Sequence, residues 1–169
     1  LQKNRIPLES VMAKSWNKKI FKQIDEQVNK ASKDLAEERG ACPDAAEYGY
    51  QERFSNKTAI APTASISIIC GGASPGVEPV AANSYTHKTL SGSFNVRNRY
   101  LEEILESHGK NDDETWSTIT TNQGSVSHLD FLTDLEKDVF KTAFELNQKW
   151  IIELSGDRTP FISQAQSVN

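Results

Sequence analysis

Apolar residues recur at intervals of three and four near the start of the chain, the spacing of one face of an α-helix. The pattern predicts a helix from about Glu9 to Arg39. Pro7 restricts the backbone before it, and Gly40 stands where a left-handed C-terminal cap is expected. The opposite face carries charged residues and is expected to face solvent. The apolar positions are Trp16, Ile20, Ile24, Val28, Ala31 and Leu35.

Helical patterning returns in the second half of the chain. A strand-like SFNV precedes a helix predicted from about Asn98 to Ser107. The tract 111–128 has turn chemistry and little periodicity, so we expect an exposed connection there.

The C-terminal third contains two helix-start signals. Thr133 and Glu136 form a T-x-x-E capping box before an apolar stripe that runs to Phe144, and a second helix is expected from near Asn147. Thr159 followed by Pro160 is typical of an N-cap and first helical residue, so the ending FISQAQSVN is expected to continue as helix.

A different pattern occupies KTAIAPTASISIICGGASPGVEP, residues 57–79. The apolar run 58–61 ends at a proline, which removes a ladder donor, so it predicts a short strand. Thr63 is placed to cap a short helix that runs to Ile69 and is closed by Gly71 and Gly72.

This helix start is a candidate anion site. The first N–H groups of a helix lack intrahelical partners and carry a positive partial charge, which suits a phosphate. Hydroxyls at Thr63, Ser65 and Ser67 add possible donors, and no Asp or Glu lies between Phe54 and Val77. The alternative is that Thr63 only caps its helix. Neither a Walker loop nor GxGxxG is present.

Composition excludes several other classes of function. A net charge of −4 argues against a general nucleic-acid or membrane-surface binder. Cys42 and Cys70 are too far apart for a CxxC motif, and no secretory segment is recognised ahead of them, so we expect reduced thiols and a cytoplasmic location. Cys70 is expected to pack as a small hydrophobe. The three histidines are scattered, so we expect no metal site.

Five blocks of sequence together carry a family resemblance: IAPTASIS, SPGVEP, YTHKTLSGSFNVRNRYLEEIL, LEKDVFKTAFELNQKWIIEL and FISQAQSVN. They resemble the late catalytic-barrel region of the large (alpha) subunit of class I ribonucleotide reductase. The resemblance covers residues 6–169 and implies an α/β fold, with residues 1–169 a mostly helical fragment of a ten-stranded α/β barrel. We therefore expect a piece of a longer chain and no complete independent domain.

The resemblance also implies a binding site. In this family the matching loop holds the diphosphate of a ribonucleoside diphosphate substrate. The positions that match are Pro62, Thr63, Ala64, Ser65, Ile66 and Ser67. Neither Cys42 nor Cys70 matches a radical or redox cysteine, so no catalytic residue is assigned and the segment is expected to be inactive alone.

The parent enzyme of such a segment would reduce ribonucleoside diphosphates to 2′-deoxyribonucleoside diphosphates for DNA synthesis. The resemblance implies an alpha homodimer, a radical-generating small (beta) subunit that contains metal, a thiol reductant and ATP or dNTP effectors. No cofactor is expected in this segment itself. Two alternatives remain: a fragment of the adenosylcobalamin-dependent class II enzyme, or a non-enzymatic helical interaction protein in which the Thr63 loop is only a capped turn.

Overall fold

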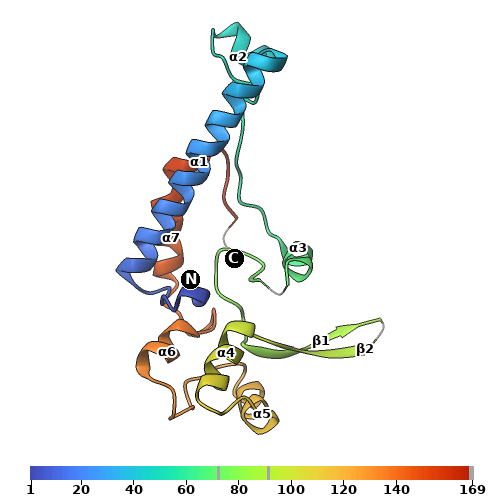
Figure 1. Cartoon of the computed structure of the whole chain (residues 1–169), viewed down its shortest axis with the longest axis vertical. Helices are drawn as coiled ribbons and strands as arrows, with labels where there is room; N and C mark the ends of the chain where they lie inside the picture. Colours follow the sequence, from blue (N-terminus) through green and yellow to red (C-terminus); the bar gives the residue numbers. More distant parts are fainter. Residues whose placement is uncertain (72, 91, 168–169) are drawn as a thin grey trace. The chain divides into compact units, whose positions relative to one another are not determined.

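The computed structural model describes residues 1–71, 73–90 and 92–167 (Figure 1). The chain forms two compact units. Residues 1–13 and 63–151 make the first unit, and residues 14–62 and 152–167 make the second. The chain passes between the units within α1 (Val11–Arg39), between Pro62 and Thr63, and within α7 (Lys149–Arg158).

The second unit is built on α1, which runs along α7. Asn17 Nδ2 donates to the carbonyl of Leu154 at 2.8 Å, and Lys14 pairs with Glu153. Helix α1 begins two residues later than predicted, and Gly40 has a φ of +83°, which confirms the left-handed cap.

Much of the predicted apolar stripe of α1 is not covered. Trp16, Ile20 and Ile24 are 40–44% exposed. The buried residues of α1 are instead small ones on an adjacent face of the helix. One of them is Ser32, whose hydroxyl accepts hydrogen bonds from the amides of Arg53 and Phe54. These contacts hold the loop that follows the short helix α2 (Pro43–Glu47) against α1.

The predicted strand at residues 58–61 is reduced to an isolated parallel bridge between Ile60 and Gln166. The helix expected at the C-terminal end is wrong. Thr159 is the first residue of a 3-10 turn, η2 (Thr159–Phe161), and the backbone is extended at Ile162. Residues 163 and 164 form a bend, and the backbone of residues 164–167 pairs with residues 58–60, a long-range contact that overrides the local helix signal.

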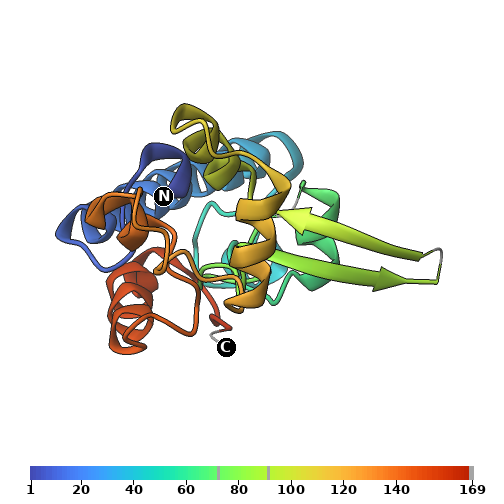
Figure 2. The same ribbon diagram turned by 90° about the horizontal axis from the view of Figure 1, so that it is seen from below.

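The first unit contains a short turn, a hairpin and four short helices. The turn is η1 (Gln2–Asn4), and strands β1 (Ser84–Thr89) and β2 (Gly92–Arg97) form an antiparallel hairpin. This hairpin extends away from α4 (Arg99–Ser107) and α5 (Asp113–Thr121), as Figure 2 shows. The other helices are α3 (Ala64–Ile69) and α6 (Asp134–Val139).

The bounds of helix α4 agree with the prediction to within one residue. Asn98 is its N-cap, and the Asn98 side chain accepts a hydrogen bond from the Tyr100 amide at 3.1 Å. Strand β2 contains the predicted SFNV, whereas β1 was not predicted. The exposed connection predicted for 111–128 is wrong, because α5 lies there. Three of its four threonine hydroxyls bond back to carbonyls of its own helix, which masks the helical pattern in a polar sequence.

The capping box of α6 is confirmed: Thr133 and Glu136 exchange hydrogen bonds between side chain and backbone. The helix ends at Val139, however, so Phe144 is not on its buried face and is 85% exposed.

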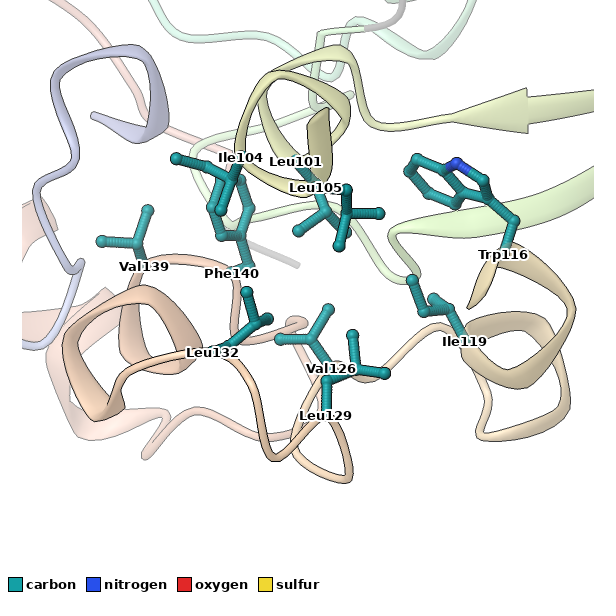
Figure 3. Close-up of a cluster of buried hydrophobic side chains, with 10 residues drawn as sticks. All are labelled: Leu101, Ile104, Leu105, Trp116, Ile119, Val126, Leu129, Leu132, Val139 and Phe140. Atoms are coloured by element: carbon teal, nitrogen blue, oxygen red, sulfur yellow. The ribbon is translucent and has the colours of Figure 1, made fainter. Parts of the chain in front are cut away.

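The core of the first unit lies between α4, α5 and the chain that leads into and out of α6 (Figure 3). Its ten buried side chains are Leu101, Ile104, Leu105, Trp116, Ile119, Val126, Leu129, Leu132, Val139 and Phe140.

Gly124 lets the chain turn sharply after α5. Its φ is +80°, and a Cβ there would lie 2.3 Å from the Cβ of Ala82. Gly124→Ala is therefore expected to lower the free energy of unfolding by about 2–4 kcal/mol, from left-handed strain together with a steric clash. Gly109→Ala is the matched control, because Gly109 also has a positive φ but has open space around it. It is expected to cost only about 1 kcal/mol. Urea titration followed by tryptophan fluorescence measures both, and equal losses would contradict the role assigned to the clash.

Burial alone would raise the pKa of Glu136, but hydrogen bonds from Thr133 and His108 hold it below the ordinary 4.5. A lowered folded-state pKa means that the stabilisation is present above about pH 4.5 and is lost as the pH falls through the folded value. We expect Glu136→Gln to reduce the acid sensitivity of unfolding in that range, while Glu103→Gln at an exposed site of α4 leaves it unchanged. Urea midpoints at pH 6 and pH 3.5 measure the difference, and parallel losses in both variants would contradict it.

Candidate functional site

The six residues predicted to bind an anion span the point where the second unit ends and the first resumes. Pro62 is exposed and follows shortly after the Ile60 bridge. Thr63 is the residue before α3, and Ala64, Ser65, Ile66 and Ser67 form its first turn.

Thr63 does not cap α3 through its side chain, so that part of the prediction is wrong. Its N–H and its hydroxyl both donate to the carbonyl of Pro75, each at 2.9 Å. Thr63 therefore ties the start of α3 to residues 74–76, which we call the SPG turn, and its hydroxyl proton is already used.

The first turn of α3 presents unpaired backbone donors. The first partnered amide is that of Ser67, which donates to the Thr63 carbonyl at 2.7 Å. In the described ranges, the amides of Ala64, Ser65 and Ile66 have no hydrogen-bond partner. Three adjacent N–H groups without partners can bind an oxyanion.

The three hydroxyls of the loop are not equivalent. The buried Ser67 hydroxyl donates to the carbonyl of Ala64 at 2.7 Å, so it stabilises the turn. Ser65 is exposed, and no partner of its hydroxyl is found among the described residues. The structure therefore leaves Ser65 as the hydroxyl donor of the loop, rather than all three serine and threonine side chains.

The C-terminal end of α3 is closed as predicted at Gly71, with a φ of +82°, while Gly72 lies outside the described residues. Cys70 is exposed, so the prediction that it packs as a small hydrophobe is wrong. Arg99 approaches this end of the helix, where a Cβ on Gly71 would lie 3.7 Å from its Nη1.

A cavity of about 710 Å³ lies beside α3 within the first unit. Its wall includes Ala64 and Ser67 of the loop, the SPG turn, and the bases of β1 and β2. Glu78 contributes a carboxylate oxygen, Oε2, that is buried without a partner in the part of the chain that the structure describes. Arg97 at the same wall is paired with Asp113 at 2.7 Å.

Two other features are absent from the described residues. No three side chains of His, Cys, Asp or Glu gather in an arrangement that holds a metal ion. In the same ranges, no helix has the length and apolar character needed to cross a membrane.

Comparison with known proteins decides the family. The sequence model of the ribonucleotide reductase barrel domain matches residues 44–169. The chain belongs to this family. The resemblance to the reductase barrel and its fold, drawn from the five sequence blocks, is thereby confirmed.

Relatives of this ribonucleotide reductase segment are named as large subunits. Over its whole length the chain is 45% identical to the ribonucleoside-diphosphate reductase large subunit of Invertebrate iridescent virus 6, covering 18% of that protein. It is 43% identical to that of Invertebrate iridescent virus 3, covering 27%. The class Id ribonucleotide reductase alpha subunit of Actinobacillus ureae matches all of the chain and 30% of its own length, with a TM-score of 0.90 and 40% identity. The chain thus spans less than a third of each of these relatives.

Sequence reasoning missed the side chains that hold this reductase segment together. Asn98 donates a partly buried hydrogen bond to Asn83, and Arg158 donates to Gln166. Asn98 lies in the block SFNVRN and Gln166 in the block QAQSVN, and neither side chain has its partner at a helical or strand spacing. For Asn98 the signal in the sequence is a polar residue at the end of a strand-like block.

Thr63→Val removes the hydroxyl but keeps the β-branched shape. We expect it to loosen the contact with Pro75 and to speed amide hydrogen exchange at Ser67 several-fold, whereas Thr63→Ser keeps the donor and the slow exchange. If both variants exchange at the same rate, the hydroxyl contact does not hold the start of α3.

Proposed function

We propose that this chain is part of the large subunit of a class I ribonucleoside-diphosphate reductase and that it supplies the loop that binds the substrate diphosphate. The unpaired first turn of α3 is the observation that carries the proposal. The family match and the names of the relatives support it.

In the proposed site the amides of Ala64, Ser65 and Ile66 donate to the phosphate oxygens, and the Ser65 hydroxyl adds one more donor. Hydrogen bonds to a charged acceptor are shorter and stronger than those between neutral groups. Thr63 and Ser67 hold the backbone in place through Pro75 and Ala64. Pro62 fixes the backbone that enters the turn.

The absence of acidic residues from Phe54 to Val77 also supports an anionic ligand. A carboxylate beside a diphosphate would cost binding energy through like-charge repulsion. The next carboxylate along the chain is that of Glu78, which lines the same cavity as Ala64 and Ser67 and is therefore the acidic group that a nearby phosphate would meet first.

The chemistry of reduction is assigned to other parts of the large subunit. Radical and redox cysteines of the family have no match at Cys42 or Cys70, so this segment binds and orients substrate and does not turn it over alone. A second alpha subunit, a radical-generating beta subunit with its metal, a thiol reductant and nucleotide effectors complete the proposed enzyme. The proposed location is the cytoplasm.

Of the two alternatives, neither gains support from a specific observation. The relatives described above are named as diphosphate reductase large subunits or as a class Id alpha subunit, which favours class I over the adenosylcobalamin-dependent class. A purely structural role of the loop would leave the three adjacent amides of α3 unused.

Ser65→Asp in the complete large subunit tests the loop. The new carboxylate repels the diphosphate and removes a donor, so substrate should bind roughly ten- to several-hundred-fold more weakly, since charge-assisted bonds are worth about 1.5–3 kcal/mol each. Ser65→Ala should cost less, because the backbone amides remain.

The matched control is Ser55→Asp, which adds the same charge at an exposed serine outside the loop. It is expected to leave diphosphate affinity unchanged. Equilibrium binding of a ribonucleoside diphosphate and thermal melts are measured for all three variants. Wild-type affinity in a folded Ser65→Asp protein would remove the phosphate assignment and return the loop to a capped turn.

A further inference from the structure

Arg158, the last residue of α7, is a buried cation in the second unit. Arg158 is only 4% exposed. The guanidinium donates in three directions: to Gln166 Oε1 at 2.7 Å, to Ser155 Oγ at 2.7 Å and to Asn17 Oδ1 at 3.4 Å. Its face lies over the ring of Phe21, 5.6 Å from the centroid.

All three acceptors are neutral, and no carboxylate forms an ion pair with Arg158 in the described part of the chain. Burial lowers the pKa of this guanidinium because the charged form loses hydration. A buried charge without an opposite charge is costly, so an apolar residue would fill the same space at lower cost. The planar fork of arginine does what an apolar residue cannot: it fixes three separate groups in one geometry.

The group that Arg158 fixes is the side chain of Gln166. The amide nitrogen of Gln166 also donates to the Ser155 carbonyl at 3.1 Å and to Thr159 Oγ1 at 2.8 Å. Both ends of this carboxamide are therefore held by α7 and the turn that follows it. Segment 163–167 is anchored at this point.

The anchored segment is the pairing partner of residues 58–60. The Ile60 amide donates to the Ala165 carbonyl at 3.0 Å, and the Ser167 amide donates to the Ile60 carbonyl at 2.8 Å. At the other end, the Ser163 hydroxyl accepts from the amides of Lys57 and Thr58 at 2.9 and 2.8 Å. These contacts fix the backbone of residues 57–60, which leads directly into Pro62.

We propose that Arg158 is a positioning residue for substrate binding. Through Gln166 it holds segment 163–167 against residues 58–60, the stretch of the second unit that continues along the chain into Pro62. This inference rests on the proposed diphosphate-binding role of that loop. A small displacement of a binding group weakens its hydrogen bonds to the ligand even though no contact residue has changed.

Two variants separate this role from general stability. Arg158→Met removes the fork but keeps a long side chain, and Gln166→Leu leaves Arg158 in place while cutting its link to segment 163–167. Arg39→Met is the control, since Arg39 is an exposed arginine at the end of α1 in the same unit. Arg158→Lys is expected not to rescue, because one ammonium cannot reach three acceptors in the arginine geometry.

The measurements are steady-state kinetics of the complete large subunit with its radical-generating partner and reductant, and amide exchange at Ile60 and Ser167. We expect Arg158→Met and Gln166→Leu to raise the KM for the ribonucleoside diphosphate about tenfold or more, with kcat within about twofold of wild type. Exchange at the two amides should become faster in both variants, and Arg39→Met should change neither.

An unchanged KM together with faster exchange would overturn the proposal and leave Arg158 with a structural role. Slow exchange in a folded Gln166→Leu protein would overturn it as well, because the link to residues 58–60 would not depend on the side chain. If Arg158→Met does not fold, Gln166→Leu decides the question by the same two readouts. Failure of this proposal alone is recognised when Ser65→Asp weakens diphosphate binding but Gln166→Leu does not.

Discussion

The buried carboxamide of Asn83 is the interaction on which the first unit depends. Its Nδ2 donates to the carbonyls of Gly124 and Phe140 at 3.0 and 2.7 Å, and its Oδ1 accepts from Asn98 Nδ2 at 2.8 Å. One side chain thereby joins the start of β1, the N-cap of α4, the turn after α5 and the end of α6. Removing it would leave several buried polar groups unpaired, which costs more than the bonds themselves contribute. The close approach of residues 82 and 83 to Gly124 is part of the same constraint, because only glycine leaves room for it.

At the proposed phosphate loop, most polar groups are used to hold the backbone. Thr63 and Ser67 donate their hydroxyl protons to carbonyls, which leaves three backbone amides and one serine hydroxyl without a partner among the described residues. Such an arrangement is pre-organised, since the donors do not have to break internal bonds before they bind an anion. Because two of the three hydroxyls in the loop already donate to carbonyls, counting serines and threonines in the sequence overstates the number of donors that can bind a phosphate.

In the second unit a buried charged side chain, Arg158, holds the backbone in place. Arg158 is kept buried by three neutral acceptors and an aromatic face, and it fixes a C-terminal segment whose own sequence suggests a helix. The apolar stripe of α1 is the opposite case, in which the sequence suggests burial and the structure shows exposure. Trp16, Ile20 and Ile24 have the spacing of a buried face but are left half uncovered by the described residues. Apolar periodicity predicts that a face can be buried, whereas tertiary contacts decide whether it is.

Local signals were sufficient for α1, α3, α4 and the capping box of α6, because each depends on residues three or four positions apart. The family of the chain and the residues of the candidate loop also follow from the sequence, since motifs such as IAPTASIS and QAQSVN are contiguous. Only the tertiary structure decided α5, strand β1, the extended end and the partners of Thr63 and Arg158. In α5 the threonine hydroxyls bond within a helix that Trp116 and Ile119 anchor in the core. Segment 163–167 is not helical because its backbone pairs with residues about a hundred positions away, and Thr63 turns to Pro75 because a folded turn brings that carbonyl within reach. Hydrogen bonds between distant residues have no periodicity in the sequence, so they can be found only once the chain is folded.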